Sequence, residues 1–200
     1  MKLNKEKEIR RFIADNLEVR ESEENSNTKK CIRGYINKFN TRSQYMGFYE
    51  EVNKSAFDKT LADGHNIYAM YNHDHSKILG STRSTSLKLY TDDIGLAFEL
   101  EINNNISYVN DLYELVSNGD IDGCSFGFYV TNDNWSYTEE GIDLRIINEL
   151  ELIEVTITPF PAYLDSEASC RSFEIHREDL EKHKQNELRK KKIEIELELL

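Results

Sequence analysis

The chain has 200 residues, with 25 Lys and Arg against 37 Asp and Glu, which gives a formal net charge of −12. This length suits one domain with modest appendages and is sufficient to bury a hydrophobic core. The acidic balance argues against a nucleic-acid surface, because phosphate binding needs clustered Lys and Arg side chains. No apolar run is long enough for a transmembrane helix, and the charged start lacks the apolar run of a signal peptide. We therefore expect partners other than nucleic acid or membrane.

The three cysteines are odd in number and widely spaced, at Cys31, Cys124 and Cys170, with no C-x-x-C pair. A disulfide framework or a structural zinc site would need paired or clustered cysteines. The pattern is typical of a protein from a reducing compartment.

In the first third of the chain, residues 2–14 predict a short charged helix with Ile9, Phe12 and Ile13 on one side. A second helix is expected from 53 to about 64, with Asn53 or Ser55 as its cap. Extended segments with β-branched and aromatic residues are expected at 17–21, 31–39 and 48–52.

The rest of the chain alternates short apolar segments with turns. Strands are expected at 67–75, 78–82, 86–90, 96–102, 121–137 and 142–158. Apolar residues at helical spacing predict a helix over 108–119. Residues 178–200 are almost entirely charged and predict a solvated helix. Many short strands with two or three helices indicate an α+β protein, mainly antiparallel, built as a barrel or sandwich with peripheral helices.

The segment Gly123–Phe128 matches the pattern G-x-S-x-G, in which a serine can be presented bare to a substrate. A nucleophile elbow of that type continues into a helix and needs a later histidine. Here aromatic and β-branched residues continue the strand, and the later histidines, His176 and His183, lie in the charged tail. If Ser125 is a nucleophile, its base lies upstream on a different scaffold. The alternative is a glycine-kinked strand with a buried serine.

A general base for Ser125 is best sought at the end of the apolar strand over residues 67–75. A side chain there can be held rigidly and still be exposed, and the strand ends in His73 and His75. Residues two apart on a strand share a face, so these histidines are expected to point the same way, with Asp74 opposite.

The hairpin expected after Ser125 supplies a third candidate. A turn centred between Glu139 and Glu140 places Glu154 opposite Ser125. A register change of one or two residues shifts that partner, so Glu151 and Glu149 remain alternatives. Such a carboxylate would fix the imidazole tautomer and stabilise its charged form.

A metal site is a weaker interpretation of the same residues. His73, Asp74 and His75 could supply two imidazoles and a carboxylate, but no further ligand has recognisable spacing. We therefore expect neither a metal nor a cofactor. Cys124 is expected to face away from Ser125 as a small buried residue.

Several segments, in their order and spacing from about 17 to 172, resemble the prohead maturation proteases of tailed bacteriophages, of the HK97 type. They are Gly34-Tyr35 with Phe39-Asn40, Glu51–Phe57, Tyr71-Asn72-His73-Asp74 with Leu79-Gly80, Asp92–Leu96, Gly123–Phe128, and Leu152–Thr156 before Pro161-Ala162-Tyr163.

The resemblance implies a serine endopeptidase with a β-barrel like that of the herpesvirus assembly proteases, ringed by a few helices. His73 matches the family's catalytic histidine and Ser125 its nucleophile, while Glu154 lies in the motif of the third residue. Thr156 stands where many members have serine. No cofactor is implied.

The resemblance also implies substrates and a place of action. Members of the family cut scaffold segments or the major capsid protein, and often themselves, inside assembling proheads in the cytoplasm of the bacterial host. A homo-oligomer is left open. We expect an N-terminal appendage at 1–14, the protease domain at 15–172 and a charged helical tail at 173–200. The alternatives are a catalytically inactive capsid-assembly or scaffold protein of the same fold and, less favoured by the histidine-before-serine order, a hydrolase of small esters.

Overall fold

The structure is a computed structural model of the whole chain, and it describes residues 6–13, 17–24, 27–159 and 167–198. Across these ranges the strands form two sheets of six and four strands. The larger sheet contains β1 (Glu8–Ile13), β9 (Gly123–Tyr137), β10 (Asp143–Thr158), β5 (Tyr68–Tyr71) and β6 (Ile78–Ser81) in this order, with β4 (Tyr49–Val52) also on β10. The smaller one contains β2 (Glu18–Glu24), β3 (Asn27–Lys38), β8 (Gly95–Glu101) and β7 (Leu87–Thr91).

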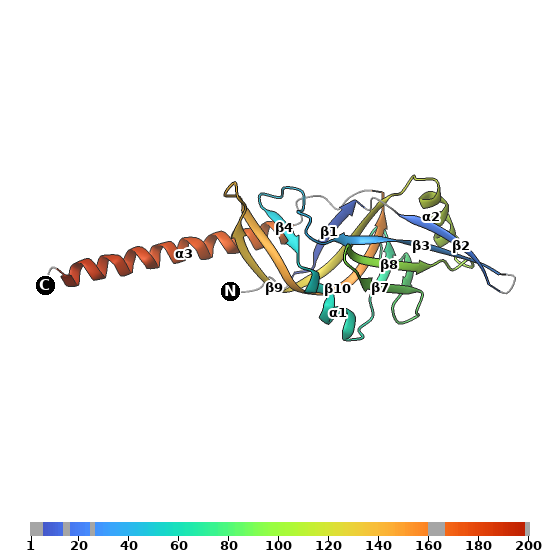
Figure 1. Cartoon of the computed structure of the whole chain (residues 1–200), viewed down its shortest axis with the longest axis horizontal. Helices are drawn as coiled ribbons and strands as arrows, with labels where there is room; N and C mark the ends of the chain where they lie inside the picture. Colours follow the sequence, from blue (N-terminus) through green and yellow to red (C-terminus); the bar gives the residue numbers. More distant parts are fainter. Residues whose placement is uncertain (1–5, 14–16, 25–26, 160–166, 199–200) are drawn as a thin grey trace.

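The long hairpin of β9 and β10 is the centre of the fold (Figure 1). Its stem is apolar and the residues of β9 from 123 to 130 are buried apart from Tyr129, whereas the tip is largely exposed. β4 and β5 run parallel to β10, and the other described ladders are antiparallel. The expected α+β class with mainly antiparallel pairing is therefore confirmed.

The helices expected from apolar spacing are also present. Asn53 caps a 3₁₀ turn (Lys54–Phe57) that leads into α1 (Asp58–Ala62), and its side chain accepts from the Ser55 backbone N–H. Helix α2 (Ser107–Ser117) buries its apolar side against the core through Val109, Leu112, Tyr113 and Val116.

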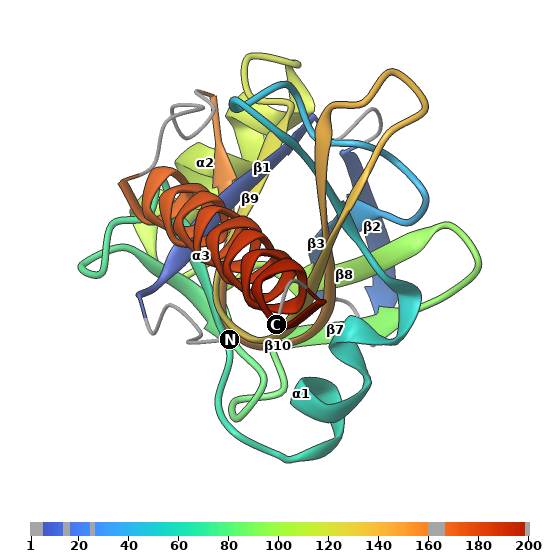
Figure 2. The ribbon, with the colours of Figure 1, turned by 90° about the vertical axis from the view of Figure 1, so that its left-hand side faces the viewer.

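Helix α3 (Glu167–Glu198) projects from the body as a single rod, seen from the side in Figure 1 and toward the viewer in Figure 2. Its root packs on the hairpin and on the residue before β4: the ring of Phe173 stacks on Phe48 at 5.3 Å, and His176 stacks on Trp135 at 4.2 Å. Residues 181–195 are all exposed, as expected for a charged helix. In the described ranges, no helix is long and apolar enough to cross a membrane.

The helix expected over residues 2–14 is wrong, because Glu8–Ile13 is a strand. The backbone of β1 pairs with β9 from Glu8 opposite Phe128 to Ile13 opposite Gly123. An isolated helix of this length is marginal in water, whereas the open edge of β9 offers a full row of backbone partners. Tertiary pairing therefore overrides the helical spacing.

The closed barrel expected from the resemblance is not found in the described part of the chain. Closure would need a ladder between the two sheets, and β1 and β6 instead end one sheet while β2 and β7 end the other. The sheets share a single core, in which Ile32 and Phe98 of the smaller sheet join Phe126 and Val155 of the larger. Apolar side chains, and not backbone hydrogen bonds, hold the sheets together.

Candidate active site

His73 lies in a tight turn directly after β5. Asn72 and His73 both have φ of 55°, in the left-handed region that side chains seldom adopt. The turn is fixed to β10, since the Asn72 N–H donates to Ile157 O at 3.1 Å and the Thr158 hydroxyl donates to Asn72 Oδ1 at 2.8 Å. His73 and His75 are therefore not on a strand, and the shared face expected from strand alternation does not apply.

The turn brings the His73 imidazole to Glu154, which is wholly buried on β10. His73 Nδ1 lies 2.9 Å from Glu154 Oε1. The same oxygen accepts from Lys7 Nζ at 3.0 Å, and Oε2 accepts from the Thr156 hydroxyl at 2.7 Å. Nε2 of His73 is buried and, among the residues described, has no hydrogen-bond partner. One ring nitrogen is thus anchored and the other is left without a partner.

The environment of Glu154 favours its charged form. Burial raises the pKa of this carboxyl, but the hydrogen bond and charge of His73, the Thr156 hydroxyl and the Lys7 ammonium outweigh it, so the pKa is lower than usual. Glu154 is therefore a carboxylate at neutral pH. As an acceptor only, it requires the proton of the neutral imidazole to be on Nδ1.

Ser125 lies on the same face of the β9–β10 pair as Glu154, but its hydroxyl makes no hydrogen bond with the His73 imidazole. Its side chain is wholly buried, and its hydroxyl donates to the backbone oxygen of Arg10, in β1, at 2.9 Å. The expectation of a serine presented bare to a substrate is wrong for this state of the protein. The alternative interpretation, a buried serine in a glycine-flanked strand, describes it.

The register of the hairpin differs from the one expected. Thr156, and not Glu154, pairs with Ser125, and Glu154 pairs with Gly127. The irregularity between Leu152 and Glu154 adds one residue to β10, and the tight end of the hairpin is centred later than expected. The shift keeps Glu154 on the face of Ser125.

Gly127 is needed where Glu154 crosses β9. A Cβ at this position would lie 2.5 Å from Glu154 Oε1 and would also meet the Lys7 side chain. Only glycine leaves room for the carboxylate and its ammonium partner.

The alternative third residues lie elsewhere on β10. Glu149 accepts from Lys59 Nζ at 2.8 Å and from the Thr131 hydroxyl at 3.0 Å, and Glu151 is exposed. Cys124 is buried in the core, which confirms that it faces away from Ser125, and burial raises the pKa of its thiol. Among the described residues, no His, Cys, Asp and Glu side chains are grouped as a metal site.

Sequence reasoning missed two contributions of the N-terminal segment, the ammonium of Lys7, directly before β1, and the backbone carbonyl of Arg10 in β1. Nothing in the local pattern marks either of them, because both depend on the pairing of β1 with β9. The contact of Thr156 with Glu154 could have been predicted, since Thr156 lies two residues after Glu154 and shares its strand face.

We expect Glu154→Gln to make the free energy of unfolding depend less on pH in the acidic range. The native pKa of Glu154 lies below the ordinary value of 4.5, so its stabilising contribution is present above that value and is lost as pH falls through the native pKa. The variant should be less stable than the parent by about 1–3 kcal/mol at pH 7, with a smaller difference near pH 3. Urea denaturation at both pH values measures this. Glu151→Gln, on an exposed position of the same strand, is the control, and an equal loss at both pH values would contradict the assignment.

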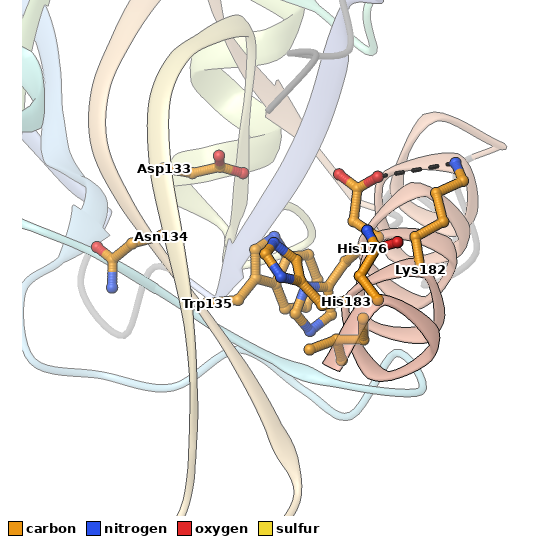
Figure 3. Close-up of a pocket in the computed structure, with 9 residues that line it drawn as sticks. Asp133, Asn134, Trp135, His176, Lys182 and His183 are labelled. Carbon is orange, nitrogen blue, oxygen red and sulfur yellow. Dashed lines mark ion pairs between the residues drawn. The ribbon is translucent and has the colours of Figure 1, made fainter. Parts of the chain in front are cut away.

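A separate cavity of about 520 Å³ lies between the tip of the hairpin and α3 (Figure 3). Asp133 and Trp135 line it from β9, and His176, Lys182 and His183 from α3. Neither Ser125, His73 nor Glu154 contributes to its wall. The candidate catalytic groups are therefore not part of this cavity.

Two known phage proteins are similar to this chain. The chain is 31% identical over 101 residues to the prohead protease of Escherichia phage T5, a match that covers 50% of this chain and 44% of the T5 protein. The chain thus spans less than half the length of that relative. The bacteriophage T4 capsid assembly protease, gp21, has a similar fold, with a TM-score of 0.55 and 12% identity over 78% of this chain and 98% of the T4 chain.

The family-level match is longer than the pairwise one. Residues 15–184 match the model of a family described as the Caudovirus prohead serine proteases. That range includes the turn of His73, the strand of Ser125 and the carboxylate of Glu154. The resemblance inferred from the sequence segments is thereby confirmed, and this chain belongs to the Caudovirus prohead serine protease family.

Proposed function

We propose that the chain is a serine endopeptidase that cleaves capsid and scaffold proteins during phage prohead maturation, with Ser125 as nucleophile, His73 as general base and Glu154 as the orienting acid. The observation that supports this best is the 2.9 Å contact of His73 Nδ1 with buried Glu154 while Nε2 has no hydrogen-bond partner. An imidazole held in this way has a fixed tautomer and a free lone pair for a hydroxyl proton.

In the proposed mechanism, Nε2 of His73 takes the proton of the Ser125 hydroxyl as Oγ attacks the scissile carbonyl carbon. The imidazolium is stabilised by Glu154, which stays ionised, and then gives its proton to the leaving amine. Water attacks the resulting acyl-enzyme with His73 again as base, and Ser125 regains its proton. Backbone N–H groups would stabilise the oxyanion in both steps.

The resting hydrogen bond of Ser125 must break before this reaction starts. The hydroxyl now donates to the Arg10 carbonyl, and it must instead donate to His73. The face shared by Ser125, Glu154 and Thr156 supports such an exchange, since the groups lie on neighbouring strands of one sheet.

Family membership supports the proposed substrates. The T5 relative is a prohead protease and the T4 structural relative is a capsid assembly protease. By analogy, this chain would cut the major capsid protein, scaffold segments and its own chain inside assembling proheads in the bacterial host cytoplasm. The charged tail from residue 173 would then be the remnant or junction of a scaffold-like segment.

The second candidate is a non-catalytic capsid-assembly protein of the same fold, which the complete burial of Ser125 favours. The purified full chain should be incubated with a proteome-derived peptide mixture and with a fluorophosphonate probe. A serine endopeptidase gives new peptide termini with a recurring residue pattern, and the probe is found on Ser125 by mass spectrometry. Absence of both new termini and probe labelling, in protein shown to be folded, supports the non-catalytic candidate instead.

A further inference from the structure

Strand β1 and Lys7, the residue directly before it, contact the candidate catalytic residues at two points. The Arg10 carbonyl accepts the Ser125 hydroxyl at 2.9 Å, which keeps that proton from His73. The Lys7 ammonium lies 3.0 Å from Glu154 Oε1, the oxygen that also holds His73. The edge strand and the residue before it therefore hold the nucleophile and the acid in a resting arrangement.

The opposite face of β1 is held by buried charges, where an edge strand would ordinarily bury apolar side chains. Glu8 and Arg10 are 0% and 7% exposed. Arg10 donates to Glu50 at 2.5 and 2.8 Å and to Glu8 at 2.5 Å. Arg145 donates to Glu8 at 2.8 Å and to Glu50 at 3.2 Å, and its Nε donates to Asp133 at 2.6 Å.

This kind of contact makes exchange of the strand selective. Apolar side chains of similar size often hold a buried position at least as firmly as an ion pair, because charges regain their hydration when they leave. Departure of β1 would leave Arg145 without the charge of Glu8 and Glu50 without the charge of Arg10. A segment that takes the place of β1 must supply an acidic and a basic residue two positions apart. Any other segment would leave the charges of Glu50 and Arg145 unpaired, which disfavours its binding.

We propose that the edge of β9 from Gly123 to Phe128 is a peptide-binding edge, and that β1 is its resident occupant. The partner is an extended peptide segment that pairs with β9 as β1 does and carries an acidic and a basic residue at alternate positions. Main-chain pairing provides the affinity and the buried charges provide the selection. The inference deepens the proposed function, since release of β1 also frees Ser125 and Glu154, but binding itself can be measured without catalysis.

The test uses the full chain with Ser125→Ala, so that no peptide is cut, and a fluorescent peptide that copies residues 6–13. A matched control peptide has the residues equivalent to Glu8 and Arg10 exchanged, which places like charges beside Arg145 and Glu50. We expect the exchanged peptide to bind at least about tenfold more weakly by fluorescence anisotropy. Equal binding of the two peptides would overturn the proposed selection by the buried charges.

A reversible lock tests whether β1 and the peptide compete. Phe12 pairs directly with Cys124 across the ladder, so Phe12→Cys places two cysteines at opposed positions, where the Cα separation suits a disulfide. Once mass spectrometry shows this disulfide, the oxidised protein should lose peptide binding and the reduced protein should regain it. Unchanged binding in the oxidised form would show that the peptide binds elsewhere.

A second variant tests the same competition without a disulfide and without altering the buried charges. Lys7→Ala removes one contact of resident β1, so the peptide should bind roughly three- to tenfold more tightly. Lys59→Ala, which removes a distant exposed ion pair with Glu149, should change nothing. If Lys7→Ala leaves the affinity unchanged, β1 does not compete with the peptide. Peptide binding in a protein that cleaves nothing would sustain this inference and refute the proposed function.

Discussion

Alanine at Ser125 or at His73 should lower kcat for peptide cleavage by about 10⁴- to 10⁶-fold. Without the hydroxyl no acyl-enzyme forms, and without the imidazole the hydroxyl has no base. Because the two side chains act in one step, the double variant should be no slower than the slower single variant. Such non-additivity would show that the two side chains act as a unit.

Two controls use the same substitutions nearby. Ser136→Ala changes another serine of β9, and His75→Ala changes the exposed histidine two residues after His73. Both should keep kcat within about twofold of the parent, as substitutions away from the reacting atoms usually do. Single-turnover cleavage of a peptide identified by terminus mapping is the measurement. A Ser125→Ala protein that still cuts at the parental rate would remove Ser125 from the mechanism.

The largest loss of stability is expected from Arg145→Met. Arg145 is 2% exposed and joins Glu8, Glu50 and Asp133. Burial lowers the pKa of this guanidinium, but the surrounding carboxylates outweigh burial and raise it, so it remains charged. Its removal takes one cation from each of these three buried carboxylates. Breaking a buried ion network in this way costs about 3–5 kcal/mol of the free energy of unfolding.

Urea denaturation followed by circular dichroism measures this loss. Arg42→Met is the matched control, because Arg42 pairs with Glu51 while its side chain is 46% exposed. Exposed pairs contribute about 0–1 kcal/mol, so the control should be nearly as stable as the parent. If the Arg145 variant is no less stable than the Arg42 variant, the buried network does not contribute as described.

Most elements after residue 17 could be predicted from the sequence, because their apolar residues recur at strand or helix spacing. The helix α2 is an example, with Val109, Leu112 and Val116 buried as their spacing indicates. β1 could not be predicted in this way. It buries Glu8 and Arg10, whose partners Arg145 and Glu50 lie 137 and 40 positions away. No local periodicity reveals a buried charge whose partner is so remote.

The candidate site was predictable in composition but not in detail. The hairpin and the strand before His73 place Glu154 and His73 on adjacent elements, as expected. The exact register was missed because the hairpin is centred later than expected and an irregularity near Leu152 shifts the pairs beyond it, and a hairpin sequence does not show where such a residue is added. The burial of Ser125 was missed for the same reason as β1, since that strand supplies its hydrogen-bond acceptor.

The projecting helix α3 has a consequence for how the body can be placed. A helix of 32 residues is about 48 Å long, and residues 181–195 in its outer part are all exposed. It behaves as a stiff spacer, because its length is fixed by the backbone hydrogen bonds of the helix. A partner bound at its far end would hold the protein body at a nearly constant distance. Shortening α3 by whole turns would reduce that distance by about 5 Å for each turn removed.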